Sequence, residues 1–424
     1  MDDQSLILIF TSILLGGIGF TYYKKETHFK TALYAISLYT FSSIMSIVFY
    51  FQPLTQSNNQ LNGNITLWPV LYWTSLFLIS LMPLFQFDNS KIVKFTYKSN
   101  LLDKIVILGI IVSIIPFLEQ LLLIPEILGG GNLDALGENM VDLHDESSLE
   151  NMSVLGRNGL RFNVAIYDLS FIILFIQFLK EKKNKLIIFG LFFIIITRNL
   201  TGIIAGHRSA AIEVIMKVLL VAIIAYPLIG SKEKKVIKNF MIWSFSIVGA
   251  VFMVITIGRQ MLYSVTKSED FTMTYFLSWY AGEGLINFNQ FLPLMKNTTN
   301  GEYTCWTLLQ LLGESPHELD YDYMYGKLTR IQGIPQNIFY TYIGNFVQDF
   351  GFFFAAIIIS ISSFAVRAIT KVRGSVMKIS TLFFIFSWAS IILRGVTSFC
   401  YNGSNGKFAI LTIIIYFFLR VTKM

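Results

Sequence analysis

Eleven long apolar runs, separated by short basic loops, constrain this chain more than any other feature. Each run is close to the roughly 20 residues with which an α-helix crosses about 30 Å of hydrocarbon. The chain has 424 residues, of which 54% are hydrophobic and only 14% are charged. The sequence therefore predicts an all-α, polytopic bundle of membrane helices. The expected spans are residues 5–23, 31–51, 67–87, 104–124, 163–180, 186–204, 209–230, 239–258, 345–366, 379–396 and 407–420.

The basic residues of the loops predict the orientation of the bundle, because Lys and Arg are in excess on the cytoplasmic side of membrane proteins. Of the 33 basic residues, 21 fall in alternate loops and in the C-terminal tail. With eleven spans, this pattern places the N-terminus outside and the C-terminus inside. Asp2 and Asp3 precede the first run and Lys24 and Lys25 follow it, the reverse of a cleavable signal peptide. We expect this run to remain as a span.

We expect a single integral membrane domain, 1–424, with two long segments on its outer side. These are an outer loop, 125–162, and a large outer loop, 259–344. No predicted inner loop exceeds about 20 residues, and chemistry is therefore expected at the outer surface or within the membrane. The net charge of +7 comes mostly from loop lysines. It indicates topology and attraction to anionic lipid headgroups, and no groove typical of nucleic-acid binding is visible.

The arginines do not follow the lysines. The inner loops hold 18 of 23 lysines, whereas seven of ten arginines lie outside or near the outer surface. The rigid, planar guanidinium group suits bidentate binding of a phosphate or diphosphate. The alternative is that each arginine reaches toward lipid headgroups as an anchor. The seven are Arg157, Arg161, Arg198, Arg208, Arg259, Arg330 and Arg394.

The turn between the sixth and seventh expected helices combines basic side chains with glycines. Arg198 precedes it, Gly202 and Gly206 lie within it, and His207 and Arg208 open the next helix. Backbone N–H groups at a helix N-terminus favour anions. This turn is therefore a predicted diphosphate-binding site, to which we assign Arg198, His207 and Arg208, with Arg259, Arg330 and Arg394 at similar depth.

A second group of polar residues lies between residues 313 and 351, near the end of the large outer loop. Its Tyr, Asp, Glu, Asn and His side chains are typical of sugar-binding clefts, although a solvated aromatic belt at the interface is the alternative. We assign Tyr325 and Tyr340 to substrate binding. His317 is the favoured general base, because histidine titrates at about 6.5 without burial. Glu314 or Asp349 would hold the histidine or the acceptor hydroxyl, and Asp320 and His207 remain further candidates.

No metal site and no cofactor are expected. The four histidines are isolated in the sequence, and Asp320-Tyr-Asp322 is a weak pair. Cys305 and Cys400 both fall on the predicted outer side, so that either a disulfide or two free thiols is compatible with the sequence.

Residues 160–400 resemble the Wzy oligosaccharide repeat-unit polymerases of bacterial O-antigen and capsule synthesis. The resemblance rests on three short stretches, 201–209, 279–289 and 337–351, and on the large outer loop late in the chain. The paired Arg and Gly motifs of some members are echoed only loosely, from Arg198 to Gly206 and from Arg330 to Gly344.

This resemblance implies a GT-C-like bundle in the cytoplasmic membrane. Such enzymes transfer a growing glycan from undecaprenyl diphosphate to the end of a new lipid-linked repeat unit at the outer face. The arginines would neutralise the diphosphate leaving group without a metal ion. A chain-length regulator and a flippase are the partner proteins that the resemblance suggests.

Two other functions remain open. An O-antigen ligase would use a similar donor and pass the glycan to a lipid A core. A flippase or transporter of lipid-linked sugars would need cations throughout the membrane depth and weak inverted symmetry. In this sequence only Lys217 lies in the middle of a span.

Overall fold

The computed structural model describes most of the helical part of the chain. The described residues are 2–25, 30–57, 64–88, 91–92, 94–96, 99–128, 152–180, 184–204, 208–225, 272–313, 326, 328–335, 338–371, 374–398, 400 and 406–421, with single residues and pairs between 234 and 253.

Helices lie at ten of the eleven expected spans, and the chain is a helical membrane protein. They are α1 (Asp3–Lys25), α2 (Thr31–Tyr50), α4 (Leu67–Ser80) with α5 (Met82–Gln86), α6 (Ser99–Leu128), α9 (Val154–Leu179), α10 (Lys185–Ile204), α11 (Arg208–Ala225), α16 (Thr341–Thr370), α17 (Ile379–Arg394) and α18 (Gly406–Val421). The eighth expected span, 239–258, lies mostly outside the described residues. Among the helices that the structure describes, six are long and apolar enough to cross a membrane: α1, α2, α4 with α5, α6, α9 and α16.

Further elements lie between these helices in the chain. One is the 19-residue helix α13 (Met273–Phe291), and the others are short: α3 (Pro53–Ser57), η3 (Leu292–Leu294), α14 (Trp306–Leu311), α15 (Leu328–Gln332) and the strands β1 (Lys94–Thr96) and β2 (Val376–Lys378). The two strands pair in parallel, with Phe95 opposite Met377. Helix α9 begins earlier than the expected 163, because Ser153 caps it: the Ser153 hydroxyl accepts a hydrogen bond from the Gly156 N–H at 3.0 Å.

The chain divides into two compact units. The first contains Met1–Ser90, Thr274–Arg373 and Ser387–Phe417, and the second contains Lys91–Met273, Gly374–Phe386 and Phe418–Met424.

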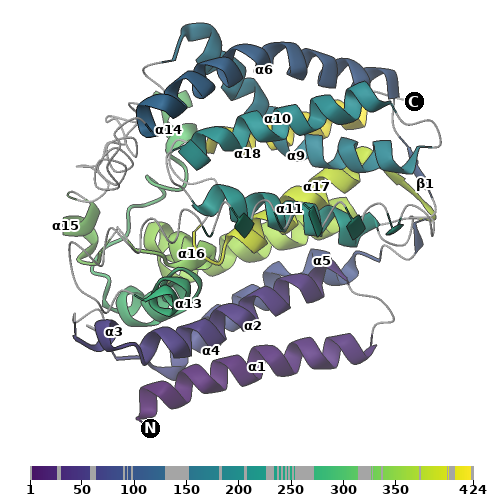
Figure 1. Ribbon diagram of the computed structural model, residues 1–424. Coiled ribbons are helices and arrows are strands. Elements are labelled where there is room, and N and C mark those ends of the chain that lie inside the picture. The colour runs from purple at the N-terminus through teal and green to yellow at the C-terminus, as the bar shows by residue number, and fades with distance from the viewer. Residues whose placement is uncertain are drawn as a thin grey trace. The chain divides into compact units, whose positions relative to one another are not determined.

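In the first unit, α1 packs on α2, and α16 packs on α4 and α5. The rings of Tyr39, Trp73 and Phe77 form its centre, with Trp73 and Phe77 stacked at 5.1 Å between ring centroids. The start of α1, α3, α13, α14 and α15 gather at one end of this unit (Figure 1). At the opposite end, Lys30 lies 3.9 Å from Asp88. The orientation predicted from the loop charges places the first set of elements outside the membrane and Lys30 with Asp88 inside.

In the second unit, α6, α9 and α10 pack against one another, and α11 packs on α9 and α10. Gly159 of α9 permits the close approach to α6, because a Cβ at this position would lie 2.5 Å from the Val112 carbonyl oxygen. Small residues at helix interfaces are typical of membrane bundles, in which backbones approach closely.

Candidate active site

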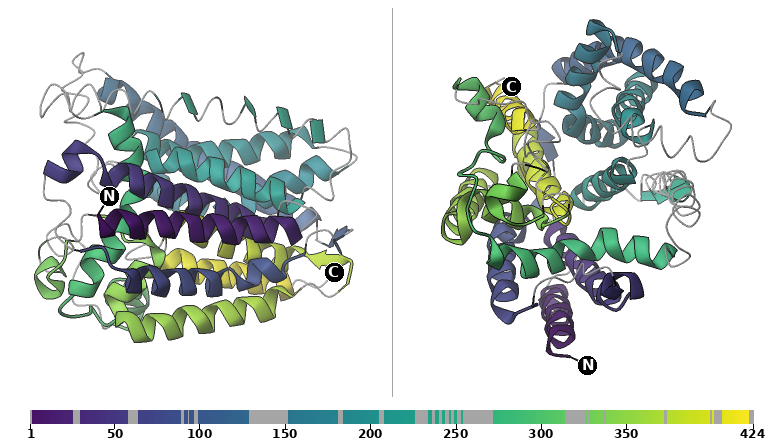
Figure 2. Two further views of the ribbon diagram at one scale, coloured as in Figure 1. Left: turned by 90° about the horizontal axis from the view of Figure 1, so that it is seen from below. Right: turned by 90° about the vertical axis from the view of Figure 1, so that its left-hand side faces the viewer.

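Helix α13, which belongs to the predicted large outer loop, lies across one end of the first unit. Figure 1 shows it end-on beside α2 and α4, and the right-hand view of Figure 2 shows it crossing the other helices of this unit. Thirteen of its 19 residues are buried. This part of the predicted outer loop is therefore an ordered component of the helical core.

Two glycines allow α13 to lie so close to its neighbours. A Cβ on Gly282 would lie 2.5 Å from backbone atoms of Met45 and Ser46 in α2, and a Cβ on Gly284 would lie 2.7 Å from the Val396 carbonyl oxygen. The Ser46 hydroxyl donates to the Gly282 carbonyl oxygen at 2.7 Å. A side chain larger than hydrogen at either glycine would push α13 away from the helices that it crosses.

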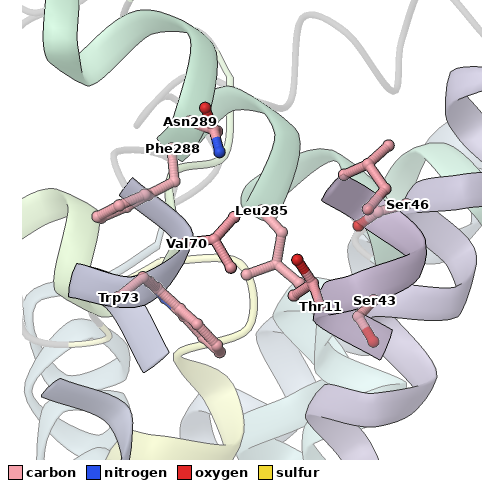
Figure 3. A pocket seen from close by; sticks show the side chains of 9 residues that line it. Thr11, Ser43, Ser46, Val70, Trp73, Leu285, Phe288 and Asn289 are labelled. Atoms are coloured by element: carbon pink, nitrogen blue, oxygen red, sulfur yellow. The ribbon is translucent and has the colours of Figure 1, made fainter. Parts of the chain in front are cut away.

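The far end of α13 is fixed by an amide pair. Asn289 donates to the Thr66 carbonyl oxygen at 2.7 Å and accepts from the Thr66 N–H at 2.8 Å. This reciprocal bond ties α13 to the residue before α4. A small cavity lies between α13 and helices α1, α2 and α4 (Figure 3), and its lining is mostly apolar, with the hydroxyls of Thr11, Ser43 and Ser46 at its edge.

Between the two glycines stands Glu283, a carboxylic acid that is only 4% exposed. Its Oε1 accepts a hydrogen bond from Asn287 Nδ2 at 2.9 Å, and Trp279 and the Phe339 backbone N–H donate to it as well. Among the described residues, no cation pairs with it. Burial raises the pKa of Glu283 from an ordinary value near 4.5 to about 8, against the opposing effect of the three donors.

This environment suits proton transfer. A group whose pKa lies near ambient pH can both accept and release a proton without a large driving force. A carboxyl that is buried without a counter-ion is a frequent way to reach such a pKa at catalytic sites. Glu283 can therefore act as a general base or general acid near neutral pH.

The start of α16 and the end of α17 meet beside α13. The Thr341 N–H donates to the Thr397 carbonyl oxygen at 3.0 Å, and the Tyr342 N–H donates to the Gly395 carbonyl oxygen at 2.8 Å. Arg394, the last residue of α17, precedes this contact and is half-buried. The contact of Gly284 with Val396 brings α13 to the same turn.

Tyr340, predicted to bind substrate, belongs to the same region. Its hydroxyl donates to the Pro335 carbonyl oxygen at 2.6 Å, and its ring lies 6.4 Å from that of Phe291 at the end of α13. The negative charge of Glu283 is close enough to raise the pKa of the Tyr340 phenol, an effect second to that of burial. Among the described residues, Tyr340 is thus a predicted site residue that lies against α13, and Arg394 ends the helix whose following turn contacts α13.

Asp349 is a second buried acid of the first unit, and like Glu283 it accepts hydrogen bonds from neutral donors. Its carboxylate accepts hydrogen bonds from the Thr299 hydroxyl and from the backbone N–H groups of Tyr303 and Thr304. The side chain is fully buried. These three hydrogen bonds tie the loop before α14 to Asp349, and the catalytic assignment of Asp349 stays a prediction.

Arg330 lies in α15, is exposed, and donates from Nε to the Gly326 carbonyl oxygen at 3.2 Å. In the second unit, Arg198 lies in α10, with its Nε buried and without a hydrogen-bond partner among the residues that the structure describes. Arg208 begins α11, as expected, although its side chain is outside the described part. The predicted residues Glu314, His317, Tyr325, His207 and Arg259 lie outside the described residues.

Cys305 and Cys400 are both free thiols. Burial, and then the nearby Asp349 carboxylate, raise the pKa of the Cys305 thiol. Within the described ranges, no three His, Cys, Asp or Glu side chains form a group that could hold a metal ion.

The sequence did not single out Glu283 as a base. A signal was nevertheless present: an acid between two glycines within an aromatic and apolar stretch, Trp279 to Phe291, is unusual for a solvated loop. Comparison with known proteins adds no further information, since no family model, no curated protein and no solved structure matches the chain.

Proposed function

We propose that the chain is a membrane glycosyltransferase that polymerises undecaprenyl-diphosphate-linked oligosaccharide repeat units into O-antigen or capsular polysaccharide. The reaction would take place at the outer face of a bacterial cytoplasmic membrane. The observation that carries the proposal is Glu283, a carboxyl on a helix of the predicted outer segment that is buried without a cation among the described residues. A soluble loop needs no such group, whereas glycosyl transfer needs a base.

In this proposal Glu283 acts on the acceptor. A hydroxyl oxygen of the new lipid-linked unit attacks the anomeric carbon of the donor glycan, while the hydroxyl proton passes to the Glu283 carboxylate. The bond between the anomeric carbon and the diphosphate oxygen breaks, and its electron pair leaves with undecaprenyl diphosphate. Glu283 then returns the proton to solvent or to the departing diphosphate.

The leaving group requires positive charge where its negative charge develops. Arg394 ends α17, and the turn that follows it contacts α13 at Gly284, which supports Arg394 as one source of this charge. Arg198 and Arg208 lie in the second unit and remain predicted diphosphate ligands. Arginine can neutralise a diphosphate through paired N–H donors, so the proposed chemistry uses neither a metal ion nor a cofactor.

The test uses purified protein in lipid nanodiscs with undecaprenyl-diphosphate-linked repeat units. Wild-type protein should convert single units into a ladder, and Glu283→Gln should leave them unextended. His317→Gln is the matched comparison, because His317 is the base favoured by sequence. A ladder from Glu283→Gln and none from His317→Gln would place the base in the segment 314–325. Transfer to lipid A core instead of to repeat units would identify a ligase.

A transporter of lipid-linked sugars is the second candidate, and one observation favours it. Lys217, in a predicted span, contacts two carboxylates inside the second unit, and such groups often mark ion or substrate pathways. Proteoliposomes with fluorescent lipid-linked sugar on one leaflet would separate the two functions. Movement of the lipid across the bilayer without elongation would favour transport.

A further inference from the structure

Helices α9 and α11 of the second unit meet at a group of buried charges. The Lys217 ammonium of α11 lies 2.5 Å from Asp168 Oδ1 of α9 and 2.6 Å from Glu213 Oε1, one turn earlier in its own helix. It also lies 4.2 Å from the centre of the Tyr167 ring. The Lys217 side chain is 6% exposed. The charges are therefore largely removed from water.

Because these three charges are buried, each of them is stable only while its partners are present. Charges taken out of water are tolerated when they are paired, and removal of one partner leaves the others uncompensated. Within the described residues of this unit, the Lys217–Asp168 ion pair links α11 to α9. Because Lys217 faces a carboxylate on each helix, it fixes how α11 is placed along and around α9.

The same part of α9 also holds α10. The Tyr167 hydroxyl donates to Asn199 Oδ1 at 3.1 Å in one arrangement of the proton, or accepts from Asn199 Nδ2 at 2.8 Å in the other. Asn199 is adjacent to Arg198, and Lys217 follows Arg208 by nine residues, about 13 Å along a helix. Two neighbouring residues of α9 thus hold the two helices that carry the predicted diphosphate ligands.

We propose that Lys217 is a positioning residue: its ion pair with Asp168, with Glu213 of its own helix holding the ammonium, sets the place of α11 against α9, and thereby the place of Arg208 at the α11 N-terminus. This inference rests on the proposed function for the role of Arg208. Lys217 itself is not a ligand of the diphosphate, because two carboxylates and an aromatic ring already surround its ammonium.

Two variants separate positioning from other roles. Lys217→Met alone leaves two buried carboxylates and can fail to fold. The triple change Asp168→Asn, Glu213→Gln and Lys217→Met removes all three charges together and should fold. The exchange Asp168→Lys with Lys217→Asp keeps one ammonium and two carboxylates and restores an ion pair between α9 and α11. Lys180→Met is the control, since it removes an ion pair with Asp103 in the same unit, at 3.8 Å and more exposed.

Two measurements are made on each variant in nanodiscs. Hydrogen–deuterium exchange of residues 208–217 reports the placement of α11 without reference to activity. The apparent KM for the lipid-diphosphate donor, with kcat, reports its consequence. The triple variant should show faster hydrogen–deuterium exchange of residues 208–217. Its KM for the donor should rise by about 10- to 100-fold, as expected for a small displacement of a binding group. The charge-swapped variant, Asp168→Lys with Lys217→Asp, should return both measurements toward wild type. Lys180→Met should alter neither.

Unchanged hydrogen–deuterium exchange and unchanged KM in the triple variant would overturn the proposal. A charge-swapped variant that folds but keeps the exchange rate and KM of the triple variant would also overturn it, because Lys217 would then act through its own ammonium. The hydrogen–deuterium exchange of the variants can respond as expected while wild-type protein neither polymerises repeat units nor binds undecaprenyl diphosphate. In that case the positioning of α11 stands and the proposed function fails.

Discussion

Glu283 in the first unit and the Asp168–Glu213 pair in the second are buried acids with opposite surroundings. Neutral donors surround Glu283, namely Asn287, Trp279 and a backbone N–H. An ammonium lies against both Asp168 and Glu213. A buried acid without a counter-ion holds its proton and can exchange it, whereas buried acids beside a cation are paired with it. The comparison favours a role in proton transfer for Glu283 and a role in helix packing for Asp168 and Glu213.

The largest expected effect follows from the first half of this comparison. Glu283→Gln should lower the rate of glycan polymerisation by about 10²- to 10⁴-fold, the usual contribution of a general base. The amide retains the hydrogen-bonding shape of the protonated acid, so the amount of folded protein should stay near wild type. Initial rates in nanodiscs, normalised to protein that elutes as a single species, provide the measurement. A rate near that of wild type would make Glu283 a structural residue.

The second half of the comparison predicts a loss of stability instead. Lys217→Met should lower the free energy of unfolding by about 3–5 kcal/mol, because Asp168 and Glu213 would remain buried without a cation. Neutralising all three residues should recover most of this loss. Unfolding in detergent, followed by tryptophan fluorescence, measures both variants. Equal stability of the single and triple variants would contradict this prediction, because the two carboxylates left in the single variant would then cost nothing.

Asp349 tests whether every buried acid in the first unit is catalytic. Asp349→Asn replaces an acceptor of three hydrogen bonds from the 299–304 loop, and we expect about 1–3 kcal/mol lower stability. The fraction of Asp349→Asn protein that folds should keep most of the polymerisation rate of wild type. A loss as large as that of Glu283→Gln, in protein of normal stability, would instead make Asp349 part of the chemistry.

The smallest effect is a dependence of stability on pH. Because the pKa of Glu283 is raised in the folded protein to about 8, from about 4.5, the unfolded chain loses this proton first as pH rises. Relative to Glu283→Gln, the wild-type free energy of unfolding should fall by about 1.4 kcal/mol per pH unit between pH 6 and pH 7. Matched unfolding curves at the two pH values measure the difference. A constant difference would mean that Glu283 is ionised in the folded state.

The sequence predicted the membrane helices because length and hydropathy are local properties. It missed the placement of α13, because this depends on contacts such as that of Ser46 with Gly282, more than two hundred residues away. For the same reason Glu283 could be read from sequence as a solvated acid. The start of α9 was placed too late because one capping serine, Ser153, extends the helix beyond its apolar run.

Site residues were predictable to the extent that their roles follow from residue type. Tyr340 was chosen for chemistry and lies against Phe291 of α13, and Arg394 precedes the turn that contacts Gly284, but both roles stay predictions. Asp349 was also chosen for chemistry, as an acid just inside an apolar helix, but its partners are the Thr299 hydroxyl and loop N–H groups. Only the packing of residues 299–304 distinguishes these cases.

Helix α16 is interrupted at Gly351, where φ is +71°. The interruption frees carbonyl oxygens that a continuous helix would use itself, and the outer segment takes them: Thr299 N–H donates to Gln348 and Gly301 N–H donates to Asp349, each at 3.3 Å. Backbone bonds of this kind do not depend on which side chains the loop carries. One glycine in the helix thus creates a backbone binding site for residues 299–301. Substitutions of the loop side chains leave these two backbone hydrogen bonds available.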